Sequence, residues 1–222
     1  MPERSLELER KFSAPAGFVP DLAGLVEIAS VATHELDAAY HDTLVCALAD
    51  AGWSLRRRTG GRDDGWTLKR PTSGEARTEV TSPDDPAMPE ALRQEVREVT
   101  GLAAVVPVAR LRTRRRESML TRDGVLVATL AQDAVRATTS AGDDSWDEVE
   151  VELEPGAPAT LLDQLTDRLV AGGAVPAPHT SKVARALAAV PRPGEPSGPE
   201  TPARAVLLAW AARQVGVLQA LE

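Results

Sequence analysis

The stretch LELERKF at residues 6–12 decides how the fold of this chain is best interpreted. Successive side chains of a β-strand point to opposite faces, so Glu7, Glu9 and Lys11 share one face. The leucines, the arginine and the phenylalanine share the other. A row of two carboxylates and an ammonium is either a solvated face with cross-strand ion pairs or one wall of a charged interior. Charged residues at alternate positions in later segments favour the second interpretation.

Composition limits the class of protein. The chain has 222 residues, enough for one large or two small domains with a sizeable core. Its single cysteine, Cys46, excludes an intrachain disulfide and fits a reducing compartment. The sequence shows neither a membrane-length apolar run nor a signal peptide, so we expect a cytoplasmic protein. The net charge of −8 argues against nucleic acid as a partner.

Periodicity and turn signals predict a mainly β chain. The expected strands cover residues 6–12, 33–40, 53–58, 65–69, 77–80, 105–120, 125–130, 133–139 and 146–153. The expected helices cover residues 21–28, 44–51, 90–100, 160–171 and 181–189. Roughly eight strands with short connections predict an α+β fold, mainly β, in which one antiparallel sheet closes into an eight-stranded barrel with flanking helices.

The end of the chain differs in composition from the rest. Residues 191–202 are rich in Pro, Gly, Glu and Ser, which is typical of a linker, so we expect a first domain over residues 1–190. Residues 203–222 carry an apolar stripe at helical spacing. An amphipathic helix needs a surface to pack on. It either folds back on the barrel or, as we favour, begins a further domain.

A predicted hairpin concentrates positive charge on one face. Arg56 and Arg58 are two residues apart on one strand, and Lys69 lies on the return strand. Like charges on one face repel unless an anion or facing carboxylates compensate them. Exposure to solvent is the alternative explanation.

The segment at residues 146–153 is the acidic counterpart of this hairpin. Glu148, Glu150 and Glu152 share one face with Trp146, whereas the opposite face is apolar. Three carboxylates in phase would be stabilised by divalent cations or by facing arginines. A solvated edge strand is the alternative.

The basic and acidic strands together suggest a ligand. A barrel interior lined by both kinds of charge is tolerated best when it also holds ligand and water. Cationic side chains bind phosphoryl oxygens, and carboxylates hold Mg²⁺ or Mn²⁺ that bridges the same phosphates. The pattern therefore indicates a chain of phosphates as the ligand.

An ordered series of short motifs resembles the CYTH family, the triphosphate tunnel metalloenzymes. In order along the chain, the motifs are ELERK at 7–11, YHDT at 40–43, LRRR at 55–58, WTLK at 66–69, TRR at 113–115, the acidic strand at 148–152 and SK at 181–182. The resemblance covers about residues 3–190. The chain has only three lysines, Lys11, Lys69 and Lys182, and all of them fall on motif positions.

The resemblance implies an eight-stranded tunnel that binds triphosphate compounds with one or two divalent metals. It implies that phosphate is bound by Lys11, Arg56, Arg58, Lys69, Arg115 and Lys182. It implies that metal is bound by Glu7, Glu9, Glu150 and Glu152, with Glu148 as an alternative register, and that Glu7, Glu9 and Lys11 carry catalysis. Arg112 and Arg114 lie on the face opposite Arg115 unless a bulge intervenes.

The last segment, residues 203–222, resembles the opening of a CHAD domain, a neighbour associated with polyphosphate. This resemblance favours inorganic triphosphate or polyphosphate as the ligand. We therefore expect a divalent-metal-dependent triphosphatase that hydrolyses inorganic triphosphate. A triphosphate-binding module with little or no turnover is the main alternative, and an adenylate cyclase is a second.

One departure from the family pattern bears on activity. Thr129 stands where relatives commonly have an acid, and Gln132 stands near a second such position, which leaves Asp133 as the nearest carboxylate. Loss of a carboxylate weakens a metal site and is the reason for the binding-module alternative. His34 and the other two histidines lack metal-ligand spacing and are interpreted as structural or surface residues.

Overall fold

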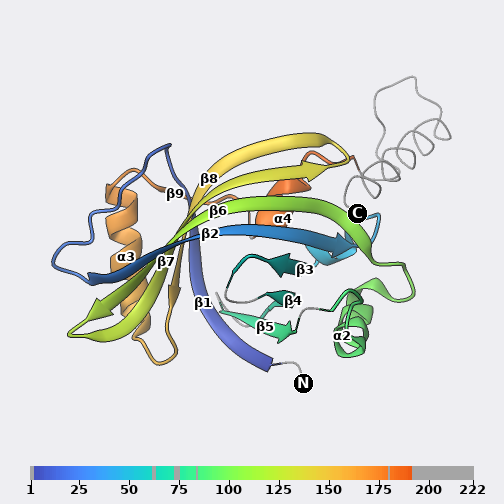
Figure 1. Cartoon of the computed structure of the whole chain (residues 1–222), viewed down its shortest axis with the longest axis horizontal. Coiled ribbons are helices and arrows are strands. Elements are labelled where there is room, and N and C mark those ends of the chain that lie inside the picture. Colours follow the sequence, from blue (N-terminus) through green and yellow to red (C-terminus); the bar gives the residue numbers. More distant parts are fainter. Residues whose placement is uncertain (1–2, 62–63, 73–75, 84, 180, 192–222) are drawn as a thin grey trace.

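A closed antiparallel sheet forms most of the molecule. The computed structural model describes residues 3–61, 64–72, 76–83, 85–179 and 181–191. The sheet order is β5-β4-β3-β2-β6-β7-β8-β1-β9, and an additional pairing of β5 with β1 closes it into a barrel (Figure 1). Because β9 pairs with the end of β1 outside this closure, eight strands form the wall, as predicted.

The bounds of the elements are close to those predicted in most places. The strands are β1 (Glu3–Ser13), β2 (Glu27–Asp42), β3 (Ser54–Thr59), β4 (Gly65–Pro71), β5 (Ala76–Ser82), β6 (Val106–Arg122), β7 (Val125–Thr139), β8 (Gly142–Leu153) and β9 (Val175–Pro176). The helices are α1 (Ala47–Asp50), α2 (Glu90–Thr100), α3 (Ala159–Ala171) and α4 (Lys182–Ala186). The segments at 125–130 and 133–139, predicted as two strands, are one continuous strand, β7.

The predicted helix at residues 21–28 is wrong. The Asp21 side chain accepts the backbone N–H of Ala23 at 3.1 Å, and Gly24 has φ +75°. Both features are typical of a turn, because Asp competes for local backbone donors and glycine adopts positive φ at little cost. The segment therefore turns, and β2 begins at Glu27.

The predicted helix at residues 44–51 is reduced to the short helix α1. The buried carboxylate of Asp42 accepts backbone N–H groups of Leu48 at 2.8 Å and Ala49 at 2.9 Å. The hydroxyl of Thr43 accepts the N–H of Ala47 at 3.0 Å. Asp42 and Thr43 therefore both cap the helix, and the loop before it wraps around the Asp42 side chain.

Three apolar clusters pack around the charged interior. Val149 and Val151 of β8 pack with α3, on the face of β8 opposite its glutamates. Leu55 of β3 and Leu68 of β4 pack with α1 and α2 on the outer side of the basic hairpin. The largest buried side chains therefore lie mainly between the barrel wall and the helices that cover it.

The third cluster lies on the inner side of the sheet. It contains Tyr40, Leu111 and Trp146 from the strands together with Val183 and Leu187 from the last helical segment. The helix α4 (Figure 1) contacts β7, and Val183 and Leu187 belong to one apolar cluster with residues of β6, β7 and β8. This packing brings the N-terminus of α4 to the barrel interior.

Two further observations concern the chain as a whole. Within the described part, no helix is long and apolar enough to cross a membrane. The predicted linker and helix at residues 192–222 lie outside the described residues.

Candidate metal and phosphate site inside the barrel

Alternation along the strands places the predicted site residues on the inner face of the barrel. In the register of β1 and β8, Glu9 lies opposite Glu152 and Lys11 lies opposite Glu150. The central cavity is lined by Glu9, Lys11, Tyr40, Ser54, Arg56, Arg58, Lys69, Arg77, Arg115, Glu150, Glu152, Ser181 and Lys182. Glu7, the remaining predicted residue, contacts Lys69. The structure thus brings together all the residues that the sequence assigned to the site.

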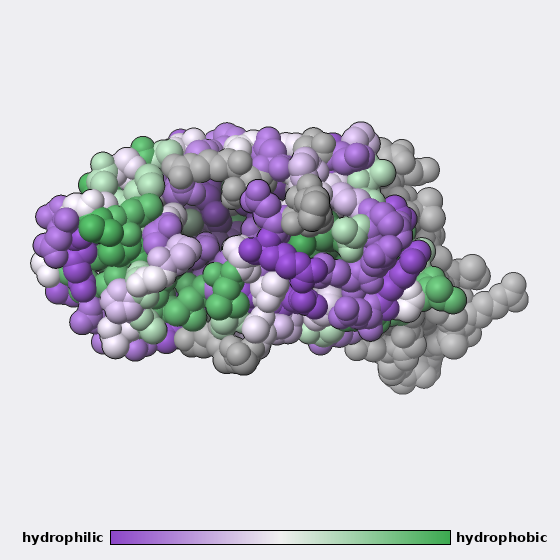
Figure 2. Space-filling view, turned by 90° about the horizontal axis from the view of Figure 1, so that it is seen from below, coloured by the Kyte–Doolittle hydropathy of each residue, from purple (hydrophilic) through white to green (hydrophobic). Residues whose placement is uncertain are grey.

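The cavity itself is small because the charged side chains reach across it. Its volume is about 60 Å³, room for roughly two water molecules. The face of the molecule seen in Figure 2 is largely hydrophilic and is hollowed near its centre. A ligand of several phosphates would therefore have to rearrange the ion pairs inside the barrel.

Lys69 is held between two carboxylates. Its Nζ lies 2.6 Å from Oε2 of Glu7 and 2.9 Å from Oε2 of Glu79. Burial raises the pKa of Glu7 to about 8. Burial also raises the pKa of Glu79, but Lys69 and a hydrogen bond from Glu7 outweigh burial and bring it to about 2. Two adjacent carboxylates in an enclosed site favour binding one proton between them.

Lys11 lies between the first strand and the acidic strand. Its Nζ is 2.9 Å from Oε1 of Glu9 and 2.5 Å from Oε1 of Glu150. Burial acts to raise the pKa of Glu9, but Lys11 and Lys69 outweigh it, so the pKa of Glu9 is lowered. Glu9 and Glu150 are thus ionised in the interior of the barrel.

A second cluster surrounds Asp133. Arg115 donates two hydrogen bonds to this carboxylate, at 2.8 and 2.7 Å, and a third to Glu150 at 2.7 Å. Nζ of Lys182 lies 2.9 Å from Asp133, 2.5 Å from Glu148 and 2.8 Å from Glu150. Ser181 caps α4 by accepting the N–H of Ala184 at 3.1 Å, which fixes the place where Lys182 enters the barrel.

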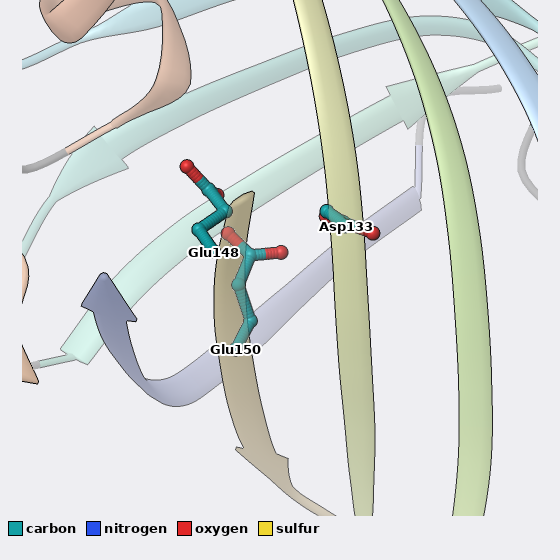
Figure 3. A group of neighbouring side chains, drawn as sticks. All are labelled: Asp133, Glu148 and Glu150. Carbon is teal, nitrogen blue, oxygen red and sulfur yellow. The ribbon is translucent and has the colours of Figure 1, made fainter. Parts of the chain in front are cut away.

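The three acids of this cluster come from the neighbouring strands β7 and β8. Figure 3 shows Asp133, Glu148 and Glu150 with their carboxylates close together, and one oxygen of each lies within 4.8 Å of the others. Burial raises the pKa of Asp133, but Lys182 and Arg115 outweigh burial and hold it below its usual value. Carboxylate oxygens are the ligands that Mg²⁺ and Mn²⁺ prefer.

Glu152 differs from the other interior acids. Among the described residues, no cation lies within 4.0 Å of its carboxylate, and its cross-strand partner is another acid, Glu9. Burial raises the pKa of Glu152. Lys69 acts to lower it, but the nearby acids, Glu9 first among them, add to the increase. An added cation would relieve this repulsion.

The rest of the predicted site lies on β3 and β6. Arg56 donates to the hydroxyl of Tyr40 at 3.5 Å, and Arg58 is buried. On β6, the side chains of Arg112 and Arg114 are 69% and 73% exposed, whereas Arg115 points inward. The β6–β7 register is regular through this region, so no bulge interrupts the alternation.

The two positions that depart from the family pattern lie on opposite faces of β7. Gln132 points outward, where it donates to the carbonyl of Phe18 at 2.7 Å. Thr129 lies opposite Glu152, and its hydroxyl donates to Glu154 at 3.5 Å. An acid at residue 132 would therefore not reach the barrel interior, and Glu154 places a carboxylate beside Thr129.

Sequence reasoning missed Glu79 as an interior acid. The sequence predicts only a short strand at residues 77–80, because a single carboxylate lacks the alternating pattern of the acidic strands. The signal was its phase: Arg77 and Glu79 are two residues apart, and both contribute to the interior set. Its cross-strand pairing with Lys69 required the structure.

Comparisons with known proteins bear on this arrangement. The family model described as CYTH domain matches residues 5–186. Two uncharacterized proteins from two strains of Mycobacterium tuberculosis are each 38% identical over 91% of this chain. The chain spans 44% of the length of these curated relatives.

Two solved structures share the fold at low sequence identity. One, from Bacillus halodurans, is provisionally named an adenylate cyclase: identity 16%, TM-score 0.53, covering 82% of this chain and 97% of that one. The other, from Hippeastrum, is provisionally named an adenylyl cyclase with a dominant triphosphatase activity: identity 19%, TM-score 0.50, covering 81% and 94%. Together with the family match over most of its length, the closed barrel shows that this chain belongs to the CYTH domain family.

Proposed function

We propose that this chain is a divalent-metal-dependent triphosphatase that hydrolyses inorganic triphosphate, or a related triphosphate compound, inside its barrel. One observation carries the proposal: lysines and arginines on some strands face carboxylates on others across a single small cavity. A run of phosphates needs many cationic donors, and a metal bound to phosphate needs carboxylates beside it. Both sets are present in one interior.

The residues present fit a divalent cation. Glu9 and Glu152 lie directly opposite each other, and no ion pair of Glu152 within 4.0 Å is found among the described residues, although the charge of Lys69 acts on it. We assign Glu7, Glu9, Glu150 and Glu152 as the metal ligands, with Asp133 and Glu148 beside them. When bound, Mg²⁺ or Mn²⁺ would neutralise phosphoryl charge and lower the pKa of a coordinated water.

The cationic residues have a separate role in the proposal. Lys11, Arg56, Arg58, Lys69, Arg115 and Lys182 would bind the phosphoryl oxygens, the arginines as planar multiple donors and the lysines as compact charges. Positive charge fixed around the substrate stabilises the charge that develops on the transferred phosphoryl group. It also orients the chain of phosphates along the barrel.

Phosphate release from tripolyphosphate with Mg²⁺ or Mn²⁺ tests this function. We expect Glu9→Ala and Lys11→Ala to lower the rate at least about a hundredfold. Glu95→Ala is a matched control, because Glu95 is similarly enclosed and ion-paired, with Arg4, outside the barrel. Equal rates in wild type, Glu9→Ala and Lys11→Ala would overturn the proposal.

A binding module without turnover is the second candidate. It is favoured by the ion pairs of Asp133 with Arg115 and Lys182, and by Thr129 at a position where the family resemblance leads us to expect an acid. This candidate predicts tight triphosphate binding in a calorimeter and no phosphate release over hours. Turnover at ordinary enzyme rates would exclude it.

An assay with three compounds tests which of them is the substrate. We propose that the segment at residues 203–222 begins a CHAD-type neighbour, which favours tripolyphosphate or longer polyphosphate over nucleotides. Tripolyphosphate, long-chain polyphosphate and ATP are offered at equal concentration, and both phosphate and cyclic AMP are measured. Cyclic AMP as the main product would point instead to the cyclase activity after which the structural relatives are named.

A further inference from the structure

The three lysines of the barrel differ in the acids that they contact. The metal ligands assigned above are Glu7, Glu9, Glu150 and Glu152. Lys69 contacts Glu79, which lies outside that set, at 2.9 Å. Lys182 contacts Glu150 of that set at 2.8 Å, and it also contacts Asp133 at 2.9 Å and Glu148 at 2.5 Å, which lie outside it. Each of these two lysines would keep a carboxylate partner if the assigned ligands turned to a metal.

Lys11 has a different pair of partners. Both carboxylates at its Nζ belong to the assigned metal ligands, Glu9 at 2.9 Å and Glu150 at 2.5 Å. These two acids come from neighbouring strands, β1 and β8, and the three side chains are 16%, 6% and 12% exposed. The ammonium therefore lies where carboxylates from two strands converge, which is the arrangement that a divalent cation requires.

We propose that the Lys11 ammonium is a built-in counter-ion at the metal position: a divalent cation replaces it at Glu9 and Glu150, and the displaced ammonium then binds phosphate. This inference rests on the proposed function. Two ionised carboxylates this close in an enclosed site repel unless a cation lies between them. Lys11 supplies that cation before the metal does, and it competes with the metal for the same oxygens.

The exchange links the two halves of the site. Metal binding would release one phosphate-binding group. Phosphate binding to Lys11 would remove its ammonium from Glu9 and would take away one of three cations at Glu150, which also contacts Arg115 and Lys182. By thermodynamic linkage, each ligand then raises the affinity for the other. Direct contact between metal and phosphate also raises both affinities, so the inference is tested with metal alone.

Mn²⁺ binding in the absence of triphosphate, followed by electron paramagnetic resonance, gives the first test. Lys11→Met removes the competing ammonium but keeps a long unbranched side chain, and it should tighten Mn²⁺ binding by at least about tenfold. Arg56→Met is the matched control: it removes one positive charge from the same cavity, at a residue that contacts Tyr40. The control should tighten Mn²⁺ binding less than Lys11→Met does, because it removes a positive charge at a residue that contacts Tyr40 and leaves the Lys11 ammonium at Glu9 and Glu150. An equal gain in both variants, or none in Lys11→Met, overturns the inference.

A measurement on the wild type covers the case in which Lys11→Met does not fold. The chain has only three lysines, so the side-chain ammonium signals in nitrogen-15 NMR can be assigned with single Lys→Arg variants. Titration with Mg²⁺ should move the Lys11 signal more than the Lys182 signal, because Lys11 loses both of its carboxylate partners whereas Lys182 loses Glu150 but keeps Asp133 and Glu148. A Lys11 signal that stays unchanged at saturating Mg²⁺ contradicts the inference. Neither test contains triphosphate, so their failure is distinguishable from failure of the proposed triphosphatase activity.

Discussion

Removal of Lys182 should cost much of the stability of the barrel. Its side chain is 9% exposed and contacts three acids, of which Asp133 is 0% exposed. Lys182→Met leaves these carboxylates with less positive charge in a site that water scarcely reaches. Breaking a buried ion pair costs about 3–5 kcal/mol. We expect the lower end, because Arg115 still pairs with Asp133 and Glu150.

Thermal unfolding at pH 7, followed by circular dichroism, measures this loss. A loss of about 3 kcal/mol should lower Tm by roughly 6–12 °C for a domain of this size. Arg114→Met is the control, because Arg114 is 73% exposed and 3.6 Å from its acidic partner, and its Tm should stay within about 2 °C of the wild type. A Tm of Lys182→Met equal to that of the control would show that the ion pairs of Lys182 do not stabilise the barrel.

The effect should depend on pH with a definite sign. Lys182 helps to lower the pKa values of Asp133 and Glu150 below those of the unfolded chain, although burial opposes it. Carboxyl groups with lowered pKa values stabilise the fold above their unfolded pKa of about 4, and this contribution is lost as pH falls through the folded values. The Tm gap between wild type and Lys182→Met should therefore shrink as the pH is lowered from 7 toward 3. A constant gap would contradict this.

Three further predictions concern separate parts of the structure. Burial lowers the pKa of His41 from 6.5 to about 4. Between pH 6.5 and 4, the free energy of unfolding of the wild type, measured by denaturant titration, should therefore fall by up to about 3 kcal/mol relative to that of His41→Gln. Parallel pH profiles of the two proteins would contradict this. Gly60 has φ +92°, and a Cβ there would lie 1.9 Å from the carbonyl oxygen of Glu35. Gly60→Ala should therefore lower the free energy of unfolding by at least about 1 kcal/mol. An unchanged denaturation midpoint would contradict this prediction. Thr129 lies opposite Glu152. Thr129→Asp adds a carboxylate ligand and should tighten Mn²⁺ binding several-fold, as measured by electron paramagnetic resonance. Unchanged or weaker binding would show that this position does not face the metal.

Local alternation made much of the barrel predictable. Residues 6–12 and 146–153 each separate a charged face from a largely apolar one, and the structure places those faces inside and outside the wall. The helix at 90–100 was also predicted with its observed bounds. These features depend on short-range periodicity and on capping, which are written in consecutive residues.

The ion-pair network was not predictable in the same way. Whether Lys11 contacts Glu150 or Glu148 depends on the register between strands almost 140 residues apart, which no local pattern encodes. The turn at residues 21–26 was mistaken for a helix because its apolar spacing fits both structures, and the side chain of Asp21 decides between them. Glu79 was missed because its partner lies on another strand.

A crystal of the protein soaked with tripolyphosphate and Mn²⁺ would show directly whether the barrel interior binds metal and phosphate together. We expect phosphates inside the barrel in contact with Arg56 and Lys69. We expect Mn²⁺ at Glu9 and Glu150, and the Lys11 ammonium in contact with a phosphoryl oxygen. Anomalous scattering from Mn²⁺ would locate the metal independently of the phosphates. Triphosphate bound only on the outer surface, with the interior ion pairs unchanged, would contradict the proposal that the barrel interior is the binding site.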